Sequence, residues 1–208
     1  MQPLVAAPDR RAARLIWIGL AASVLLFALQ SAADMIAVLR LHSYHSIVDL
    51  DRNNAIPDLL STAVLLTAAA GAAALGRTRT GDRWQPAALA IVLSIVAVDD
   101  LLQAEPGRGS GLLVLAALVA SAVLIAAIAR RGPRIATVAL AAGLCLLALA
   151  VKEAYWYDQF LNHVGLGDLR RGDLEYELGI VLKQGLEYLG WSLVALGLWA
   201  TVAATVVA

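Results

Sequence analysis

The sequence predicts an all-α integral membrane protein, a compact bundle of six transmembrane helices with both termini cytoplasmic. Hydrophobic residues make up 61% of the chain, well above the roughly 45–50% that is usual for soluble domains. Six apolar runs approach the ~20 residues that a helix needs to cross ~30 Å of hydrocarbon. Basic residues cluster in alternate connectors, as expected for a chain that crosses a membrane repeatedly.

The predicted helices span residues 15–39, 57–76, 86–103, 111–129, 135–151 and 178–207. Residues 1–14 form an N-terminal tail, and residues 15–208 form a single transmembrane domain. All connectors are short except 152–177, which is predicted to be an outer loop or interfacial segment. Short connectors favour one bundle without a separate soluble domain.

The first run follows Arg10, Arg11 and Arg14 and reads LIWIGLAASVLLFAL, then QSAAD. Basic residues, an apolar stretch and small residues are also typical of a cleaved signal peptide, here residues 1–33. The apolar character resumes directly afterwards in MIAVL. A full spanning helix is therefore the favoured interpretation.

The second run begins at Pro57, within the stretch DLDRNNAIPD of residues 49–58. This stretch favours a helix cap and a turn before Pro57, and a loose site of oxygen ligands is the alternative. The TAAAGAAALG segment of the second run, like Ala117 and Ser121 in the fourth run, allows close approach of neighbouring helices. The third run ends in VDDLLQAE. The fifth contains Cys145, the single cysteine of the chain, which we expect to serve in packing.

Charge segregates between the two sides of this topology. The predicted inner side holds three basic groups: Arg10, Arg11 and Arg14; Arg77, Arg79 and Arg83; Arg130, Arg131 and Arg134. Most acidic residues fall on the outer side, including Asp168, Asp173, Glu175 and Glu177 in the long connector. Because Lys and Arg are retained on the cytoplasmic side, this pattern predicts a membrane protein with a basic cytoplasmic rim and an acidic outer face.

Four acids interrupt the apolar helices: Asp34, Asp99, Asp100 and Glu187. An acid at the bilayer centre costs about 2.5–3.5 kcal/mol on insertion scales, so a partner, a proton, a cation or proximity to water must offset it. The predicted polar cluster at the outer helix ends also contains Gln103, Glu105 and Lys183. Candidate metal ligands are Asp49, Asp51, Asp99, Asp100 and Glu187.

The motifs DLDRNNAIPDLLS, VDDLLQAE and LKQGLEYLGW occur in this order. The chain thereby resembles an uncharacterised family of small bacterial multi-helix membrane proteins with DLDxExNIPTxxS, LDExxxLHE and EExLExxG motifs. The residues that match the family are Asp49, Asp51, Ile56, Pro57, Ser61, Asp99, Asp100, Glu187 and Gly190. The resemblance implies an architecture and a location, a multi-pass protein of a bacterial cytoplasmic (inner) membrane, rather than an activity.

This sequence departs from the family motifs at Asn53, Ala55, Glu105, Pro106, Lys183 and Gln184. The family has Glu, Asn, His-Glu and Glu-Glu at these positions. If the family site binds a metal, the resemblance implies that this chain has lost its histidine and several carboxylates, and that Lys183 supplies the positive charge instead.

Three functions compete. The favoured one is an accessory or scaffolding membrane protein with a structural polar cluster and with partner membrane proteins, or further copies of itself, as partners. The alternative is outer-facing binding or transport of a proton or a divalent cation, for which oxygen ligands are suited. The third is a metal-dependent intramembrane hydrolase that uses His42, His45 and His163 with Asp99 or Asp100 and Ser61. Basic groups of three satisfy topology and do not indicate nucleic-acid binding.

Overall fold

The computed structural model describes residues 7–39, 56–78, 83–102, 108–163 and 173–207. These residues form six helices: α1 (Ala7–Leu39), α2 (Ile56–Thr78), α3 (Trp84–Leu102), α4 (Arg108–Ala129), α5 (Arg134–His163) and α6 (Leu174–Val207). No strand occurs within them, so the all-α prediction is confirmed for this part of the chain.

The helices extend beyond the apolar runs that predicted them. α5 continues to His163, and α6 already begins at Leu174. The segment 152–177, predicted as an outer loop or interfacial segment, is therefore helical at both ends. The stretch KEAYWYDQFLNH that completes α5 contains neither Gly nor Pro, so nothing in it terminates the helix where the hydrophobicity falls.

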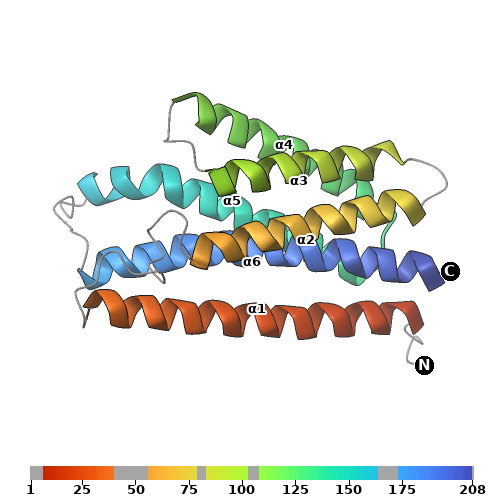
Figure 1. Cartoon of the computed structure of the whole chain (residues 1–208), viewed down its shortest axis with the longest axis horizontal. Helices are drawn as coiled ribbons and strands as arrows, with labels where there is room; N and C mark the ends of the chain where they lie inside the picture. Colours follow the sequence, from red (N-terminus) through yellow and green to blue (C-terminus); the bar gives the residue numbers. More distant parts are fainter. Residues whose placement is uncertain (1–6, 40–55, 79–82, 103–107, 164–172, 208) are drawn as a thin grey trace.

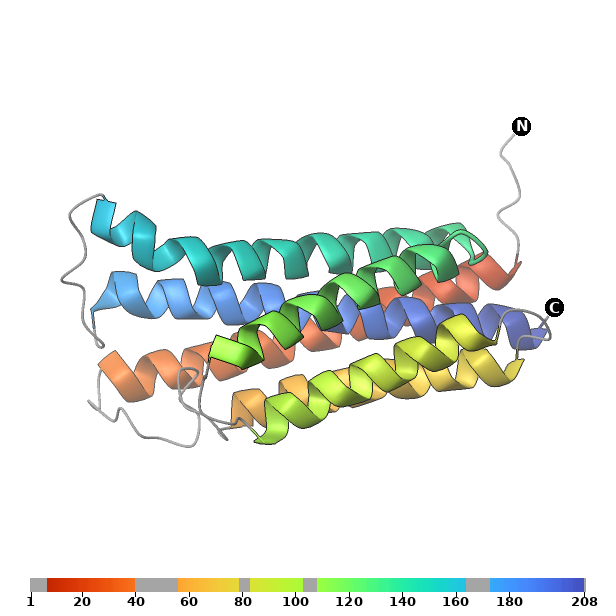
Figure 2. The same cartoon turned by 90° about the horizontal axis from the view of Figure 1, so that it is seen from above.

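Successive helices run in opposite directions, so both chain ends lie at the same end of the bundle (Figure 1). α6 is the central helix and packs against α1, α2 and α5. α3 lies on α2, and α4 lies on α3. In both views α4 meets α5 at the end near the termini and diverges from it toward the other end (Figures 1 and 2).

Three helices are long and apolar enough to cross a membrane, in the segments Arg10–Leu39, Leu59–Thr78 and Tyr176–Val206. Within the described residues α3, α4 and α5 carry shorter apolar segments: Trp84–Asp99, Ala116–Ala129 and Arg134–Ala150. A segment of 16 residues such as Trp84–Asp99 rises about 24 Å, less than the ~30 Å of a hydrocarbon core. The three long helices indicate a membrane protein.

Burial differs sharply between the two longest of these helices. The protein buries 61% of the apolar window of α6 but only 11% of that of α1. The outward face of α1 presents Trp17, Ile18, Leu25 and Leu29. An apolar face this long is unfavourable in water but suits contact with lipid.

α5 and α6 approach each other closely at Gly143 and Gly190. A Cβ atom on Gly143 would lie 2.7 Å from the carbonyl oxygen of Gly190 and 3.1 Å from the backbone nitrogen of Val194. Because these neighbours are backbone atoms, no side-chain rotation would relieve the clash. Close approach through small residues is the typical mode of helix packing in membranes.

Two side-chain contacts fix how α6 lies against its other neighbours. The Trp199 Nε1–H group donates to the carbonyl oxygen of Thr67 in α2 at 3.0 Å. Phe27 of α1 stacks on Tyr188, with ring centroids 5.8 Å apart and an interplanar angle of 21°. The Phe27–Tyr188 stack sets the register of α1 against α6, which determines the depth of their polar residues.

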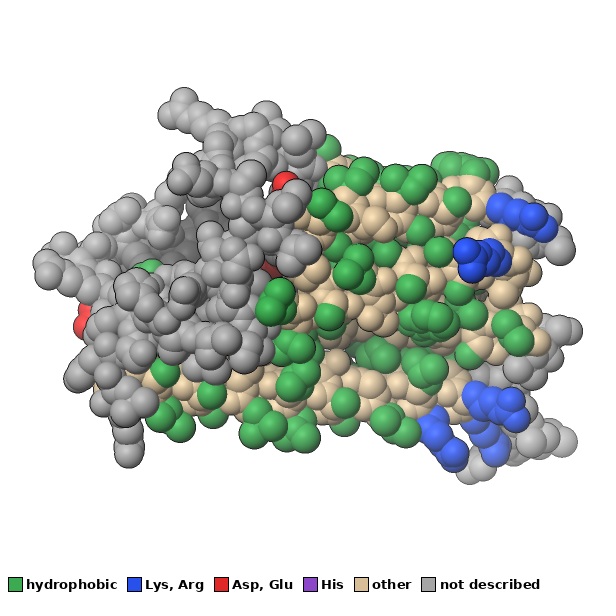
Figure 3. Space-filling model, viewed as in Figure 1, with side chains coloured by type: hydrophobic (Ala, Val, Ile, Leu, Met, Phe, Trp, Pro, Cys, Tyr) green, Lys and Arg blue, Asp and Glu red, His purple; other side chains and the backbone are tan. Residues whose placement is uncertain are grey.

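The described charged side chains are segregated along the bundle (Figure 3). The arginines whose side chains are described gather where both termini lie, at the start of α1, the end of α2, the start of α3, the end of α4 and the start of α5. We call this the basic end. The opposite end, where α1 and α3 finish and α6 begins, carries Asp34, Asp99, Asp173 and Glu177. We call it the acidic end. Among the described side chains, arginines and acids are thus segregated as the sequence predicts, whereas Lys183 lies in the half of α6 nearer the acidic end.

Candidate functional site: a buried polar cluster at the acidic end

Two acidic side chains are almost fully buried at the acidic end. Asp34 of α1 is 1% exposed and Glu177 of α6 is 2% exposed. Neither is without a partner: each interacts with another group of the chain. Buried carboxylates are tolerated in proteins only when such interactions offset the loss of water.

The Phe27–Tyr188 stack allows Asp34 and Glu177 to be placed along the bundle axis. Asp34 follows Phe27 by seven residues and Glu177 precedes Tyr188 by eleven. Since α1 and α6 are antiparallel (Figure 1), both acids lie on the same side of the stack, about 10 Å and about 16 Å beyond it at 1.5 Å per residue. They are therefore separated by about one helical turn along the axis.

Two further polar residues accompany Asp34 on α1. Gln30 and Ser31 are both buried and lie one turn before Asp34, on the same helical face. Gln30 Nε2 and Ser31 Oγ have no hydrogen-bond partner within the described residues. We refer to Gln30, Ser31, Asp34 and Glu177 as the buried polar cluster.

The cluster lies far from the basic end. Asp34 follows Arg14 by twenty residues, which is about 30 Å along a helix and matches the thickness of a hydrocarbon core. Glu187, at the level of the Phe27–Tyr188 stack, lies about 20 Å from Arg14. In a bilayer with Arg14 at one surface, α1 would carry Asp34 close to the opposite surface, where insertion of a carboxylate costs less than at the centre.

The predicted metal ligands are only partly described. Asp49 and Asp51 lie outside the described residues, and Asp100 lies in a part of α3 where only the backbone is described. Asp99 is exposed on α3, whereas Glu187 is partly buried on α6. Among the described residues there is no group of three or more His, Cys, Asp or Glu that could hold a metal ion. The five-residue metal site stays a prediction.

The remaining predicted site residues have mixed outcomes. Asp34 is buried, as an interhelical polar residue should be, while Lys183 is exposed on α6. Gln103 and Glu105 lie outside the described residues, as do His42 and His45. His163 lies at the end of α5, where only the backbone is described.

Three members of the buried polar cluster were not predicted from the sequence. Glu177 was counted with the acids of the long connector because the sixth helix was expected to begin at Leu178; α6 begins one turn earlier, and Glu177 is buried within it. Gln30 and Ser31 were taken as small or polar residues of a segment that could also end a signal peptide. Their spacing from Asp34, four and three residues, is the helical signal that identifies them.

Comparison of the chain with known protein families, with curated proteins and with solved structures returned no match. The resemblance to small bacterial multi-helix membrane proteins stays a prediction from the motifs.

Proposed function

We propose that the chain is a multi-pass protein of a bacterial cytoplasmic membrane that acts as an accessory or scaffolding protein. In this proposal all six helices span the bilayer, the basic end with both termini faces the cytoplasm, and the acidic end faces outward. The buried polar cluster secures α1 against α6. The outward-facing apolar side of α1 remains available to lipid or to a partner membrane protein.

One observation carries this proposal: Asp34 is 1% exposed and already has a partner within the chain. A carboxylate engaged in this way stabilises the association of helices, because breaking the contact would leave a polar group buried in an apolar environment. Such a cluster fixes one arrangement of α1, the helix that the protein otherwise buries least.

The proposal is tested by a matched pair of variants, Asp34→Asn and Asp99→Asn, in the detergent-solubilised protein. Both replace a carboxyl group at the acidic end by an amide of nearly the same shape, but Asp34 is buried and Asp99 is exposed. A hydrogen bond to a charged group contributes about 1.5–3 kcal/mol, and each kcal/mol shifts Tm by about 2–4 °C in a chain of this size. We expect Asp34→Asn to lower Tm by about 6 °C and Asp99→Asn to leave it within about 1 °C of the parent. Equal Tm values for the two variants would contradict the proposal.

A second candidate, binding of a divalent cation or a proton from outside, is favoured by the burial of Asp34 and Glu177 about one turn apart along the bundle axis. The same samples test it with Ca²⁺, Mg²⁺, Mn²⁺ and Zn²⁺. A cation that binds only the folded protein adds about 2.7 kcal/mol at one hundred times its Kd. A saturable rise in Tm with one ion, lost in Asp34→Asn, would replace the scaffolding proposal by the cation site.

A further inference from the structure

Three arginines near the start of α1 lie on the side of the helix that faces away from the bundle. Arg10, Arg11 and Arg14 are all exposed. At about 100° per residue they fall within an arc of about 100°. This arc lies opposite Ala12 and Ile16, which are buried in a cluster with side chains of α5 and α6. The three guanidinium groups therefore share one outward face of α1.

The start of α1 carries a net positive charge. Among the first fourteen residues Asp9 is the only acid, against three arginines. Within the part of the chain that the structure describes, these three arginines form no ion pair, in contrast to Arg83 and Arg131, which interact with other groups. Guanidinium groups bind phosphates and carboxylates well, because the planar fork donates two parallel hydrogen bonds. A ligand of this surface must therefore be an anion.

Hydrophobic side chains follow the arginines along α1 (Figure 3). Trp17 and Ile18 come three and four residues after Arg14 and are 65% and 64% exposed. Leu25, 61% exposed, lies eleven residues after Arg14, about 16 Å along the axis. This length is about half of the ~30 Å of a hydrocarbon core, and tryptophan is typical of the head-group level. The outward face of α1 thus places cations at head-group level and apolar side chains over the depth of one leaflet.

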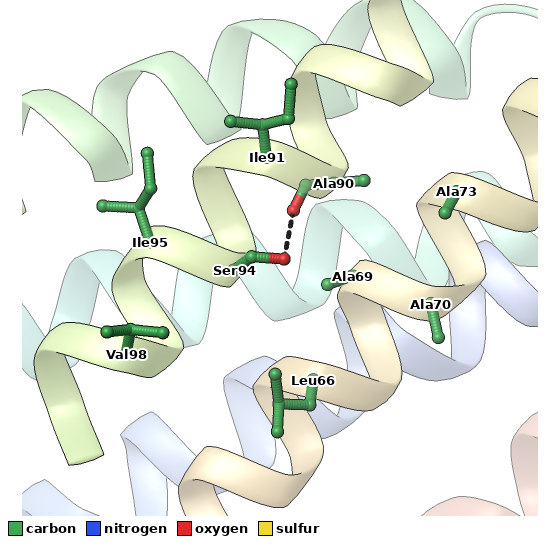
Figure 4. Close-up of a pocket in the computed structure, with 9 residues that line it drawn as sticks. All are labelled: Leu66, Ala69, Ala70, Ala73, Ala90, Ile91, Ser94, Ile95 and Val98. Carbon is green, nitrogen blue, oxygen red and sulfur yellow. Dashed lines mark hydrogen bonds between the residues drawn. The ribbon is translucent and has the colours of Figure 1, made fainter.

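The groove between α2 and α3 has no such order of charged and apolar groups. Leu66 of α2 and Ile91 of α3 line it, and the only polar side chain among its lining residues is Ser94. The Ser94 hydroxyl donates to the carbonyl oxygen of Ala90 in its own helix at 2.8 Å (Figure 4). An apolar surface of this kind accepts acyl chains of any lipid. The α2–α3 groove therefore provides an internal control for lipid selectivity.

A second copy of the chain fits the outward face of α1 poorly. Copies inserted in one membrane have the same orientation, so a two-fold contact through this face would bring two sets of Arg10, Arg11 and Arg14 to the same level. These like charges would repel each other across the contact. A zwitterionic phospholipid carries its own cation beside the phosphate, whereas an anionic phospholipid gives a net attraction to arginine. Charge complementarity therefore favours an anionic phospholipid.

We propose that the outward face of α1 binds an anionic phospholipid of the cytoplasmic leaflet. The arginines hold its phosphate, and its acyl chains lie along Trp17, Ile18 and Leu25. This inference rests on the proposed function, in which α1 spans the membrane with the basic end toward the cytoplasm. It adds the chemical class of the molecule that covers the least buried helix of the bundle.

Two labelled variants in a Cys145→Ala background test which lipid lies beside each surface. Ala21→Cys carries a bimane label on α1, seven residues after Arg14, and Ile91→Cys carries it in the α2–α3 groove, eight residues after Arg83. Both positions are exposed. The full chain is reconstituted in liposomes of equal parts phosphatidylglycerol and phosphatidylcholine, with brominated acyl chains on one lipid or the other. The quenching by each brominated lipid gives the ratio of the two lipids at the label.

We expect phosphatidylglycerol to be enriched at position 21 more strongly than at position 91. Arg14→Gln should lower the enrichment at position 21 by up to about fivefold, the factor that corresponds to one arginine near an anionic surface, and leave the ratio at position 91 unchanged. Arg14→Lys keeps the charge and should retain the enrichment. Arg11→Gln is an independent second variant on the same face and should act like Arg14→Gln.

Three results would overturn the inference and leave a membrane position of α1 intact. The first is equal quenching by the two lipids at position 21. The second is an equal loss of enrichment at positions 21 and 91 in Arg14→Gln, which would assign the effect to the net charge of the basic end. The third is quenching at position 91 but by neither lipid at position 21, since a second copy would then cover α1. Quenching at neither position would instead contradict the membrane location in the proposed function.

Discussion

Replacement of Gly143 by alanine tests the close packing of α5 on α6. The new Cβ would lie 2.7 Å from the carbonyl oxygen of Gly190, 3.0 Å from Val194 Cγ2 and 3.1 Å from the Val194 backbone nitrogen. Since two of these three are backbone atoms, α5 must move away from α6 by several tenths of an ångström. Overpacking of a well-packed interior costs about 1–3 kcal/mol. At about 3 °C per kcal/mol, we expect Tm to fall by about 3–9 °C.

The matched control is Gly76→Ala in α2. A Cβ at Gly76 would meet its nearest neighbours at 3.6 Å, which is ordinary contact. Both substitutions replace glycine inside a helix and so gain up to about 1 kcal/mol of helix propensity, but only Gly143→Ala has a clash to offset it. Melting curves of the two variants and the parent, followed by circular dichroism in one detergent, measure the difference. Equal Tm changes in both variants would refute the close approach of α5 to α6.

Three further predictions concern single side chains of α1, α5 and α6. Trp199→Phe keeps an aromatic side chain but removes the indole N–H group that donates to Thr67. One such bond contributes about 1 kcal/mol, so Tm should fall by about 3 °C, and an unchanged Tm would mean that the bond contributes nothing. Phe27→Leu removes the stacking on Tyr188, worth about 0.5–1.5 kcal/mol, and a fall of about 2–4 °C is expected in the same melting assay. Cys145 is exposed on an apolar part of α5, where it should face lipid. A membrane-impermeant maleimide should therefore leave Cys145 unmodified in intact membranes and modify it after denaturation. Rapid labelling before denaturation would contradict a lipid-facing position of Cys145.

The helices were predictable from the sequence because apolar runs and basic clusters are local properties. The segregation of arginines to one end follows from the same signals, and the described residues agree with it. The helix ends were less predictable. Hydrophobicity falls after Val151, yet α5 continues to His163 because nothing in the sequence stops it.

The buried polar cluster was predictable only in part. Asp34 was identified because an acid inside an apolar run is conspicuous. Burial of Glu177 depends on the earlier start of α6 and on the register of α6 against α1, which the Phe27–Tyr188 stack sets. That register is a tertiary property, and no single-helix pattern contains it. For the same reason Asp99, an equally conspicuous acid, is exposed on α3.

In the proposed topology the short helices cross the membrane together with the long ones, and the basic end is cytoplasmic. Two single-cysteine variants in a Cys145→Ala background test it directly: Arg130→Cys, between α4 and α5, and Asp173→Cys, just before α6; both positions are exposed. Intact cells are treated with a membrane-impermeant maleimide before and after permeabilisation of the cytoplasmic membrane. The proposed topology predicts labelling of Asp173→Cys in intact cells and of Arg130→Cys only after permeabilisation. Labelling of both positions from the same side would contradict a transmembrane α5, and the reverse pattern would contradict the proposed orientation.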